Sequence, residues 1–253
     1  MSTSNCKRPN TRQHPLSFLT TPNPRSVNVA SVVDGVLKGR YSARYYLPTP
    51  IDKATIEAIV DAASNAPSGN NMQPWKVYAI SGLIKATISN EMVKAHNNHE
   101  PYEARYAYYP PILPSEYQVR KFNFGKFWYG HLGIDHDDFA AREASNTRNY
   151  EFFDAPVALI FTMHSEMRQG SWMDLGHFMQ SITIAARARG LESVTQLSVP
   201  KFDEIIRKHL PIPEEYLVAA SISLGHPDLE KVAKYYKRPV KMELRDVLEV
   251  YGM

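Results

Sequence analysis

Two arginines and a serine are spaced so that their side chains face the same way in an extended chain. Arg40, Ser42 and Arg44 occupy alternate positions, and alternate side chains of an extended segment lie on one face. A guanidinium group pairs its N–H donors with phosphate oxygens, and a serine hydroxyl adds a short hydrogen bond. The segment therefore predicts a phosphate-binding site. The alternative is a basic helix end whose cations offset the helix dipole.

A second polar segment, residues 66–75, reads Ala-Pro-Ser-Gly-Asn-Asn-Met-Gln-Pro-Trp. Asn71 and Gln73 carry amides that both donate and accept hydrogen bonds, as recognition of the edge of a heteroaromatic ring requires. Three small or rigid residues precede them: Pro67, Ser68 and Gly69. Glycine lacks a side chain and proline fixes its own torsion, so the backbone is able to approach a ligand closely. We expect a ligand-binding loop, with an ordinary turn as the alternative.

Hydrophobic periodicity predicts the elements that must position these two segments. Apolar residues that recur every three or four positions predict helices at residues 29–39, 53–65, 83–95, 172–189, 201–209 and 243–250. Short apolar or alternating runs predict strands at residues 75–80, 155–163, 192–197 and 217–224. Helices that alternate with a few strands indicate an α+β or α/β class with a small central sheet.

Residues 96–150 form an insert that is rich in Tyr, Phe and Trp. Flat aromatic side chains suit either packing under a long connection or the wall of a pocket for a planar ligand. We keep both interpretations, an aromatic lid and plain packing. Within the insert, His136, Asp137 and Asp138 predict the start of a helix, where acidic groups are favoured.

The first 28 residues have a different composition and predict a flexible basic arm. They contain four cations, Lys7, Arg8, Arg12 and Arg25, and no Asp or Glu. Polar, proline-rich segments bury too little apolar surface to order themselves. The alternatives are an organelle-targeting signal, which the prolines disfavour, and a basic interaction module. Residues 29–253 are expected to form a single domain.

Composition excludes several classes of function. Twenty-nine Lys and Arg against 26 Asp and Glu leave a net charge of +3, too small a surplus to indicate a nucleic-acid partner. A single cysteine, Cys6, excludes an intramolecular disulfide framework and favours a cytoplasmic location. We expect no membrane span and no metal site, because His96 and His99 have no third ligand in view.

Together, and in this order, the two polar segments resemble the nitroreductase family of FMN-dependent oxidoreductases. The resemblance continues from about residue 29 to residue 252. It is carried downstream by Phe153-Asp154-Ala155-Pro156-Val157, Asp174-Leu175-Gly176 with Gln180, Gly190-Leu191 and Gly225-His226-Pro227-Asp228. The resemblance implies a three-layer α+β fold with a central, mostly antiparallel sheet. It also implies an interlocked homodimer with FMN at the interface.

The resemblance also assigns cofactor-binding roles by position. On the phosphate and ribityl chain of FMN it implies Arg40, Tyr41, Ser42 and Arg44, with Arg238 and Lys241 from the basic tail. Along the flavin ring, partly from the partner subunit, it implies Pro67, Ser68, Gly69, Asn71 and Gln73. A backbone N–H near flavin N5 would come from Gln196, Leu197 or Ser198.

The implied reaction is a ping-pong hydride transfer from NADH or NADPH, through FMN, to a small, planar, electron-poor substrate such as a nitroaromatic or a quinone. No single catalytic acid or base is expected, because the flavin performs the electron chemistry. Two alternatives stay open. One is a specialised-metabolism enzyme that reduces or oxidises a double bond. The other is a flavin-binding or flavin-degrading protein with little NAD(P)H turnover.

Overall fold

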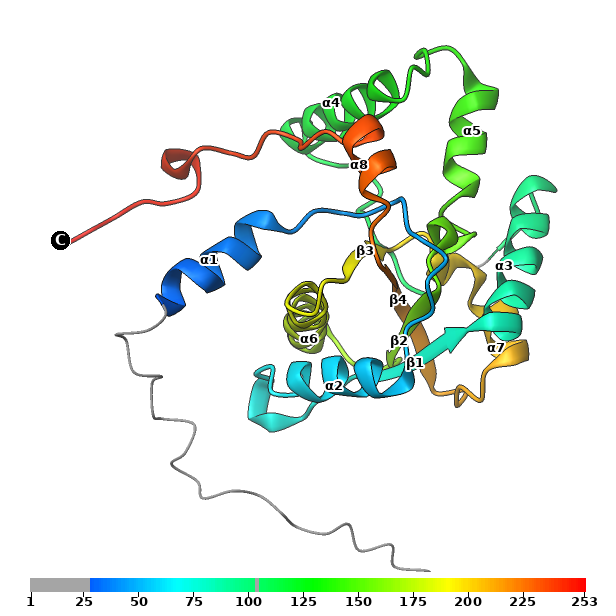
Figure 1. Cartoon of the computed structure of the whole chain (residues 1–253), viewed down its shortest axis with the longest axis horizontal. Helices are drawn as coiled ribbons and strands as arrows, with labels where there is room; N and C mark the ends of the chain where they lie inside the picture. The colour runs from blue at the N-terminus through cyan, green and yellow to red at the C-terminus, as the bar shows by residue number, and fades with distance from the viewer. Residues whose placement is uncertain (1–27, 103–104) are drawn as a thin grey trace, which may run out of the picture. The chain divides into compact units, whose positions relative to one another are not determined.

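The computed structural model describes residues 28–102 and 105–253 (Figure 1). Contacts divide the chain into two units, Met1–Gly39 and Arg40–Met253. In the described part of the first unit, helix α1 spans Val29–Gly39, as the periodicity predicts, and buries no residue. The basic arm predicted for residues 1–28 lies outside the described residues except for the last, and the single domain expected over 29–253 stays a prediction.

A four-stranded antiparallel sheet forms the centre of the second unit. Its strands run in the order β1-β2-β4-β3. Their bounds are β1 Lys76–Ser81, β2 Val157–His164, β3 Glu192–Gln196 and β4 Tyr216–Gly225. The two central strands pair antiparallel, with Leu159 opposite Ile222. Both are continuous apolar runs because both of their faces are covered.

Helices cover both faces of this sheet and make three layers (Figure 1). On one face lie α2 (Lys53–Ala63) and α6 (Gln169–Arg187), which pack on Leu159 and Phe161. On the other face lie α3 (Gly82–Asn97) and α7 (Asp203–His209), which pack on Ala158 and Ile160. Successive residues of a strand point to opposite faces. The expected three-layer α+β fold with a mostly antiparallel sheet is confirmed.

The aromatic insert contains two helices that the periodicity did not predict, α4 (Ser115–His131) and α5 (Phe139–Thr147). Neither buries a residue, so neither shows a clean apolar stripe in the sequence. The helix start predicted at Asp138 is confirmed, because its carboxylate accepts a hydrogen bond from the Ala141 N–H at 2.9 Å. That bond satisfies one of the free donors of the first turn of α5.

The end of the chain differs from the sequence prediction. The helix predicted over residues 243–250 is wrong, because only the short turn Leu244–Asp246 is helical there. Val247 is 70% exposed, and a short amphipathic helix with no surface to pack against gains little stability in water. The missed helix is α8 (Leu229–Tyr235), which Asp228 caps through the Lys231 N–H at 3.0 Å. No helix in the described part of the chain is long and apolar enough to cross a membrane.

Candidate functional site

The Arg40–Arg44 segment is held in an extended conformation along the edge of the sheet. Ser42 forms a parallel bridge with Ser193 of β3, and the Ala43 N–H donates to the Ser193 carbonyl at 3.1 Å. An extended backbone alternates its side chains, so Ala43 points into the core while its neighbours do not. Ala43 is fully buried, and Ser42 and Arg44 are half-buried. The alternation inferred from the sequence therefore has a structural cause.

Tyr46 anchors the far end of this segment. Its hydroxyl donates to the carbonyl of Ala43 at 2.8 Å and also lies 3.3 Å from the carbonyl of Ser223 on β4. Its ring lies against Gly225, where a Cβ atom would come within 2.8 Å of the tyrosine Cδ1 and 2.7 Å of Pro156 Cδ. Gly225 therefore lets the segment approach the sheet closely.

Six of the residues assigned to the phosphate by resemblance line one small hollow of about 70 Å³. They are Arg40, Tyr41, Ser42, Arg44, Arg238 and Lys241. The two parts of the chain are joined by a hydrogen bond from Arg238 Nη2 to the Arg40 carbonyl at 2.9 Å. The hollow is small and ringed by cations, so it suits a compact anion rather than a ring system.

Arg44 is held by an aromatic side chain of the insert. Its guanidinium carbon lies 4.1 Å from the centre of the Trp128 ring on α4 and 5.6 Å from that of Phe153. Burial lowers the pKa of Arg44 from its ordinary value, but an arginine stays charged at neutral pH. Sequence reasoning missed Trp128 as a site residue. Its only signal was the density of aromatic residues in the insert.

Tyr41 contributes a buried hydroxyl to the same hollow. Its ring centre lies 4.7 Å from that of Tyr236. Among the described residues its Oη atom finds no hydrogen-bond partner, and burial raises its pKa. A buried hydroxyl without a partner is costly unless a ligand or water satisfies it. Tyr41 is thus a candidate donor to a bound anion.

The second polar segment forms a strained loop that one helix holds in place. Asn70, Asn71 and Gln73 have φ angles of 49°, 58° and 48°, a region that residues other than glycine seldom adopt. The Gly69 N–H donates to Asp174 of α6 at 3.2 Å, and the Gln73 N–H donates to Ser68 Oγ at 3.0 Å. Strain of this kind gathers at ligand-binding sites.

Within one chain, this loop does not line the cationic hollow. Neither Asn71 nor Gln73 lines the hollow that contains Arg40. Pro67, Asn71 and Gln73 are exposed.

Three residues are candidates for the backbone N–H near flavin N5: Gln196, Leu197 and Ser198. Their surroundings differ. Gln196 is 3% exposed and bonded at both ends of its amide, from Ser223 Oγ and to the Asn149 carbonyl, each at 2.5 Å. Leu197 lines a cavity of about 640 Å³ beside α6. Ser198 Oγ is buried and has no hydrogen-bond partner among the described residues. Both ends of the Gln196 side-chain amide thus have a protein partner, whereas the Ser198 hydroxyl has none among the described residues.

The residues present fit a phosphorylated planar cofactor such as FMN. The cationic hollow holds N–H donors of the kind that pair with a phosphate, and the buried hydroxyls of Tyr41 and Ser198 have no hydrogen-bond partner among the described residues. Nothing comparable favours a metal ion. In the described ranges, no three His, Cys, Asp or Glu side chains gather as ligands.

Comparison with known proteins gives a family match. The signature of the Nitroreductase family matches residues 37–226. The chain is 35% identical over 209 residues to a 4-nitrobenzoate reductase of Pseudomonas putida, covering 83% of this chain and 91% of that protein. It is 34% identical over 197 residues to a nitrobenzene nitroreductase of Ectopseudomonas oleovorans, covering 78% and 87%.

Solved structures match the fold over most of the chain. The FMN- and NADPH-dependent nitroreductase NfnB from sphigopyxis sp. strain HMH superposes with a TM-score of 0.82 at 28% identity, covering 87% of this chain and 99% of that one. The FMN-dependent nitroreductase NfnB from Mycobacterium smegmatis, solved with NADPH, has a TM-score of 0.84 at 24% identity, covering 89% and 100%. The second match supports the fold alone.

Proposed function

Because the chain belongs to the Nitroreductase family, we propose that it binds FMN and uses NADPH or NADH to reduce nitroaromatic compounds. Two relatives are named for the reduction of 4-nitrobenzoate and nitrobenzene, and a neighbouring structure is FMN- and NADPH-dependent. Quinones and related electron-poor rings are further acceptors under this proposal. Donor and acceptor use the site in turn, in a ping-pong sequence.

The observation that carries this proposal is the cationic hollow. It brings Arg40, Ser42 and Arg44 together with Arg238 and Lys241. Arg238 lies 198 positions after Arg40 in the sequence. With Lys237, five cations line this small hollow, and an anion bound among them offsets their mutual repulsion. The phosphate of FMN is such an anion, and arginine pairs with its oxygens through two N–H groups.

Under this proposal the chain's residues bind and orient FMN and the substrates, and no catalytic triad is needed. FMN, when bound, supplies the chemistry of hydride acceptance and donation. Positive charge and N–H donors around a ring favour its electron-rich form, as they favour an oxyanion. Under this proposal a backbone N–H of residues 196–198 serves in this way. Tyr106 is a poor proton donor, because burial raises its pKa to about 12 and its hydroxyl donates to the Ala219 carbonyl at 2.6 Å.

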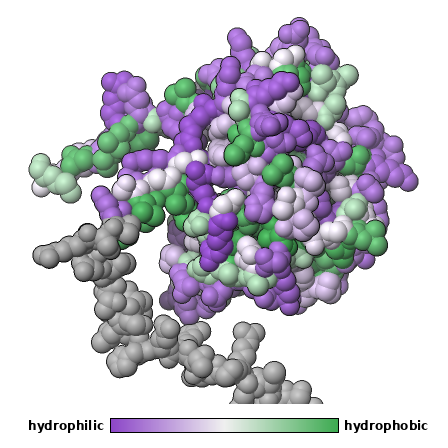
Figure 2. Space-filling model, in the orientation of Figure 1, coloured by the Kyte–Doolittle hydropathy of each residue, from purple (hydrophilic) through white to green (hydrophobic). Residues whose placement is uncertain are grey.

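The proposed active form is a homodimer. Within one chain the loop of residues 67–73 does not line the hollow, and a second copy brings the two together under this proposal. The C-terminal segment supports the proposal, because its hydrophobic residues are exposed (Figure 2). Val240 is 98% exposed and Tyr251 is 82% exposed. Apolar side chains in such numbers at the surface are typical of an interface.

The test is spectroscopic and uses the purified protein. We expect a yellow preparation, or one that turns yellow on addition of FMN. Under anaerobic conditions, one equivalent of NADPH or NADH is expected to bleach the flavin band, and 4-nitrobenzoate or nitrobenzene to restore it. A protein that stays colourless with FMN contradicts the cofactor assignment. A bound flavin that neither nicotinamide bleaches points instead to a flavin-binding or flavin-degrading protein.

A further inference from the structure

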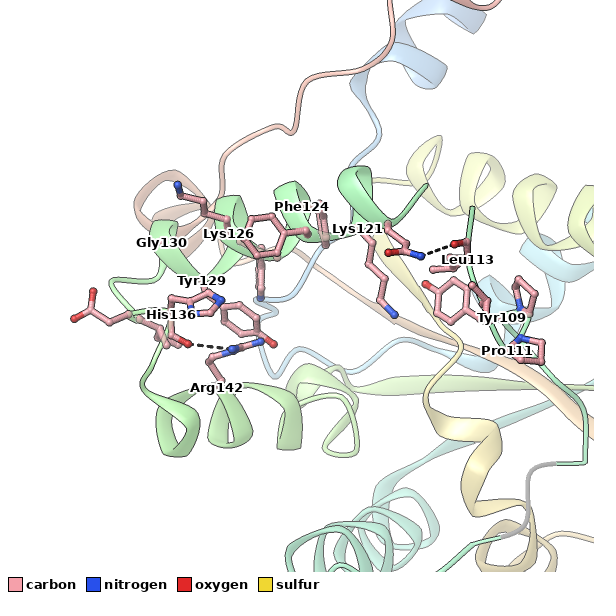
Figure 3. Close-up of a pocket in the computed structure, with 18 residues that line it drawn as sticks. Tyr109, Pro111, Leu113, Lys121, Phe124, Lys126, Tyr129, Gly130, His136 and Arg142 are labelled. Atoms are coloured by element: carbon pink, nitrogen blue, oxygen red, sulfur yellow. Dashed lines mark hydrogen bonds between the residues drawn. The ribbon is translucent and has the colours of Figure 1, made fainter. Parts of the chain in front are cut away.

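The largest described cavity lies within the aromatic insert rather than at the cationic hollow. It has a volume of about 960 Å³ and lies between α4, α5 and the segment of residues 109–113 (Figure 3). We name it the α4–α5 cavity. Its volume is at the upper end of the range of small-molecule sites. The proposed phosphate site uses none of this space, so the cavity needs its own explanation.

Aromatic rings supply much of the wall of the α4–α5 cavity. They are Tyr109, Phe122, Phe124, Trp128 and Tyr129. Phe122 is 59% exposed and Phe124 is 46% exposed, so neither ring is consumed by packing in the core. Flat apolar rings favour a planar aromatic ligand, because offset stacking and edge contacts add to the gain from burying apolar area.

Two cations point into this aromatic space. Lys121 Nζ lies 4.5 Å from the centre of the Tyr109 ring, and the Arg142 guanidinium carbon lies 4.8 Å from that of Tyr129. Arg142 is fixed by a hydrogen bond from Nη1 to the His136 carbonyl at 3.0 Å (Figure 3). Lys121 comes from α4 and Arg142 from α5. They lie over rings on opposite sides of the cavity.

The charges that line the cavity are unbalanced. Among the described residues that line it, Asp135 is the single carboxylate. In the same part of the chain, neither Lys121 nor Arg142 forms an ion pair with an Asp or Glu. Cations without carboxylate partners, set among apolar rings of low polarity, attract an anion more strongly than they would in open water.

The α4–α5 cavity adjoins the cationic hollow. Phe124 and Trp128 line both, and the guanidinium group of Arg44 lies over the Trp128 ring. A ligand in the cavity therefore lies next to the proposed FMN phosphate. This neighbourhood favours a substrate site over a separate regulatory site.

We infer that the α4–α5 cavity binds an aromatic ligand that has an anionic group, with Lys121 holding the anion. The inference rests on the proposed function, because the anion belongs to one of that reaction's substrates. It is either the carboxylate of an acceptor such as a nitrobenzoate or the phosphate on the adenosine end of NADPH. Both ligands combine a planar ring with an anionic group, which is attached to the ring itself in a nitrobenzoate and to the ribose in NADPH, and the experiment separates them.

The experiment measures equilibrium binding and needs no turnover. Benzoate, benzamide, adenosine 2′-monophosphate and adenosine are titrated calorimetrically into the full-length protein as purified. Each pair shares a ring and differs in charge. Lys121→Gln removes one cation from the cavity. The matched control is Arg120→Gln, the adjacent residue on α4, which pairs with Glu116 at 3.3 Å and does not line the cavity.

We expect one anionic probe to bind roughly tenfold to a hundredfold more tightly than its neutral partner, as charge-assisted hydrogen bonds allow. Lys121→Gln is expected to abolish most of this preference, and Arg120→Gln to leave it. A preference for benzoate identifies the acceptor's carboxylate, and a preference for adenosine 2′-monophosphate identifies the donor's phosphate. No preference for either anion, or a preference that survives Lys121→Gln or falls equally in Arg120→Gln, overturns the inference. Because flavin colour is recorded on the same sample, failure of the cofactor assignment is seen separately.

Discussion

The guanidinium carbon of Arg44 lies 4.1 Å from the centre of the Trp128 ring. Arg44 belongs to the segment that lines the sheet edge, and Trp128 belongs to helix α4 of the aromatic insert. A cation over an indole face is attracted by the ring, most strongly where water is excluded. The insert therefore does more than cover a connection, because one of its side chains orients a cation of the proposed phosphate site.

Replacing Trp128 should weaken FMN binding without removing any group that contacts the phosphate. We expect Trp128→Leu to raise the dissociation constant of FMN by a few-fold to about 30-fold, since a partly buried cation–π contact is worth about 0.5–2 kcal/mol. Quenching of flavin fluorescence measures it. Phe122→Leu, on the same helix and exposed, is the control. Equal losses in both variants would mean that α4 is merely disturbed.

Asp174 should determine the stability of the loop of residues 67–73. Its carboxylate accepts the Gly69 N–H at 3.2 Å, next to three residues with positive φ angles. We expect Asp174→Ala to lower the free energy of unfolding by about 1–3 kcal/mol, because the loop loses a hydrogen bond to a buried, charged acceptor. Asp174→Asn keeps an acceptor oxygen and should lose clearly less. Urea unfolding at one protein concentration compares them, and equal losses would refute this account of the loop.

Gly225 should tolerate no side chain. A Cβ atom there would lie 2.7 Å from Pro156 Cδ and 2.8 Å from Tyr46 Cδ1. We expect Gly225→Ala to destabilise the protein by about 1–3 kcal/mol, as overpacking does. Gly125→Ala is the control, because it lies within α4 with no atom within 4 Å of its Cβ position, and it should be neutral or stabilising. Thermal unfolding decides between them.

His96 should make the protein less stable on mild acidification. Burial lowers the pKa of its imidazole, and the Lys201 ammonium lowers it further, against Glu143, which raises it. The lowered pKa means that the unfolded chain takes up a proton first as the pH falls below the ordinary histidine value of about 6.5. Stability is therefore full above that pH and is lost as the pH falls toward the folded-state pKa.

The variant His96→Gln isolates this effect. It cannot take up the proton, so the fall in the free energy of unfolding between about pH 6.5 and the folded-state pKa should become shallower than in the unsubstituted protein. Denaturant unfolding at a series of pH values gives both curves. Parallel curves would show that other groups, rather than His96, carry the pH dependence in this window.

Much of the fold followed from patterns in the sequence. The central strands were predicted because Leu159 and Ile222 belong to short, uninterrupted apolar runs, which a strand buried on both faces requires. The prediction of a helix at residues 243–250 was wrong. The spacing of its apolar residues is amphipathic, but nothing in the described chain covers its apolar side. Periodicity records what a segment is able to bury, and it does not say whether a partner is present.

The candidate site was predictable only in its local parts. The grouping of Arg40, Ser42 and Arg44 could be predicted from their alternate spacing, because an extended backbone conformation involves only neighbouring residues. Trp128 does not, since its place over Arg44 depends on how the insert folds back. Asp174 was visible only as part of a family motif. Its role as the anchor of Gly69 needs the packing of α6 beside the loop. Contacts between segments distant in sequence leave no local pattern.

The most direct test of the account compares FMN with riboflavin, which lacks the phosphate. The unsubstituted protein is expected to bind FMN far more tightly than riboflavin, and Arg40→Ala and Arg44→Ala should each weaken FMN by roughly tenfold to a hundredfold while leaving riboflavin nearly unchanged. Fluorescence titration measures the affinity of FMN and of riboflavin for the unsubstituted protein and for each variant. If both flavins bind equally well, or if the arginine variants keep full preference for FMN, the cationic hollow does not hold the phosphate and the account is contradicted.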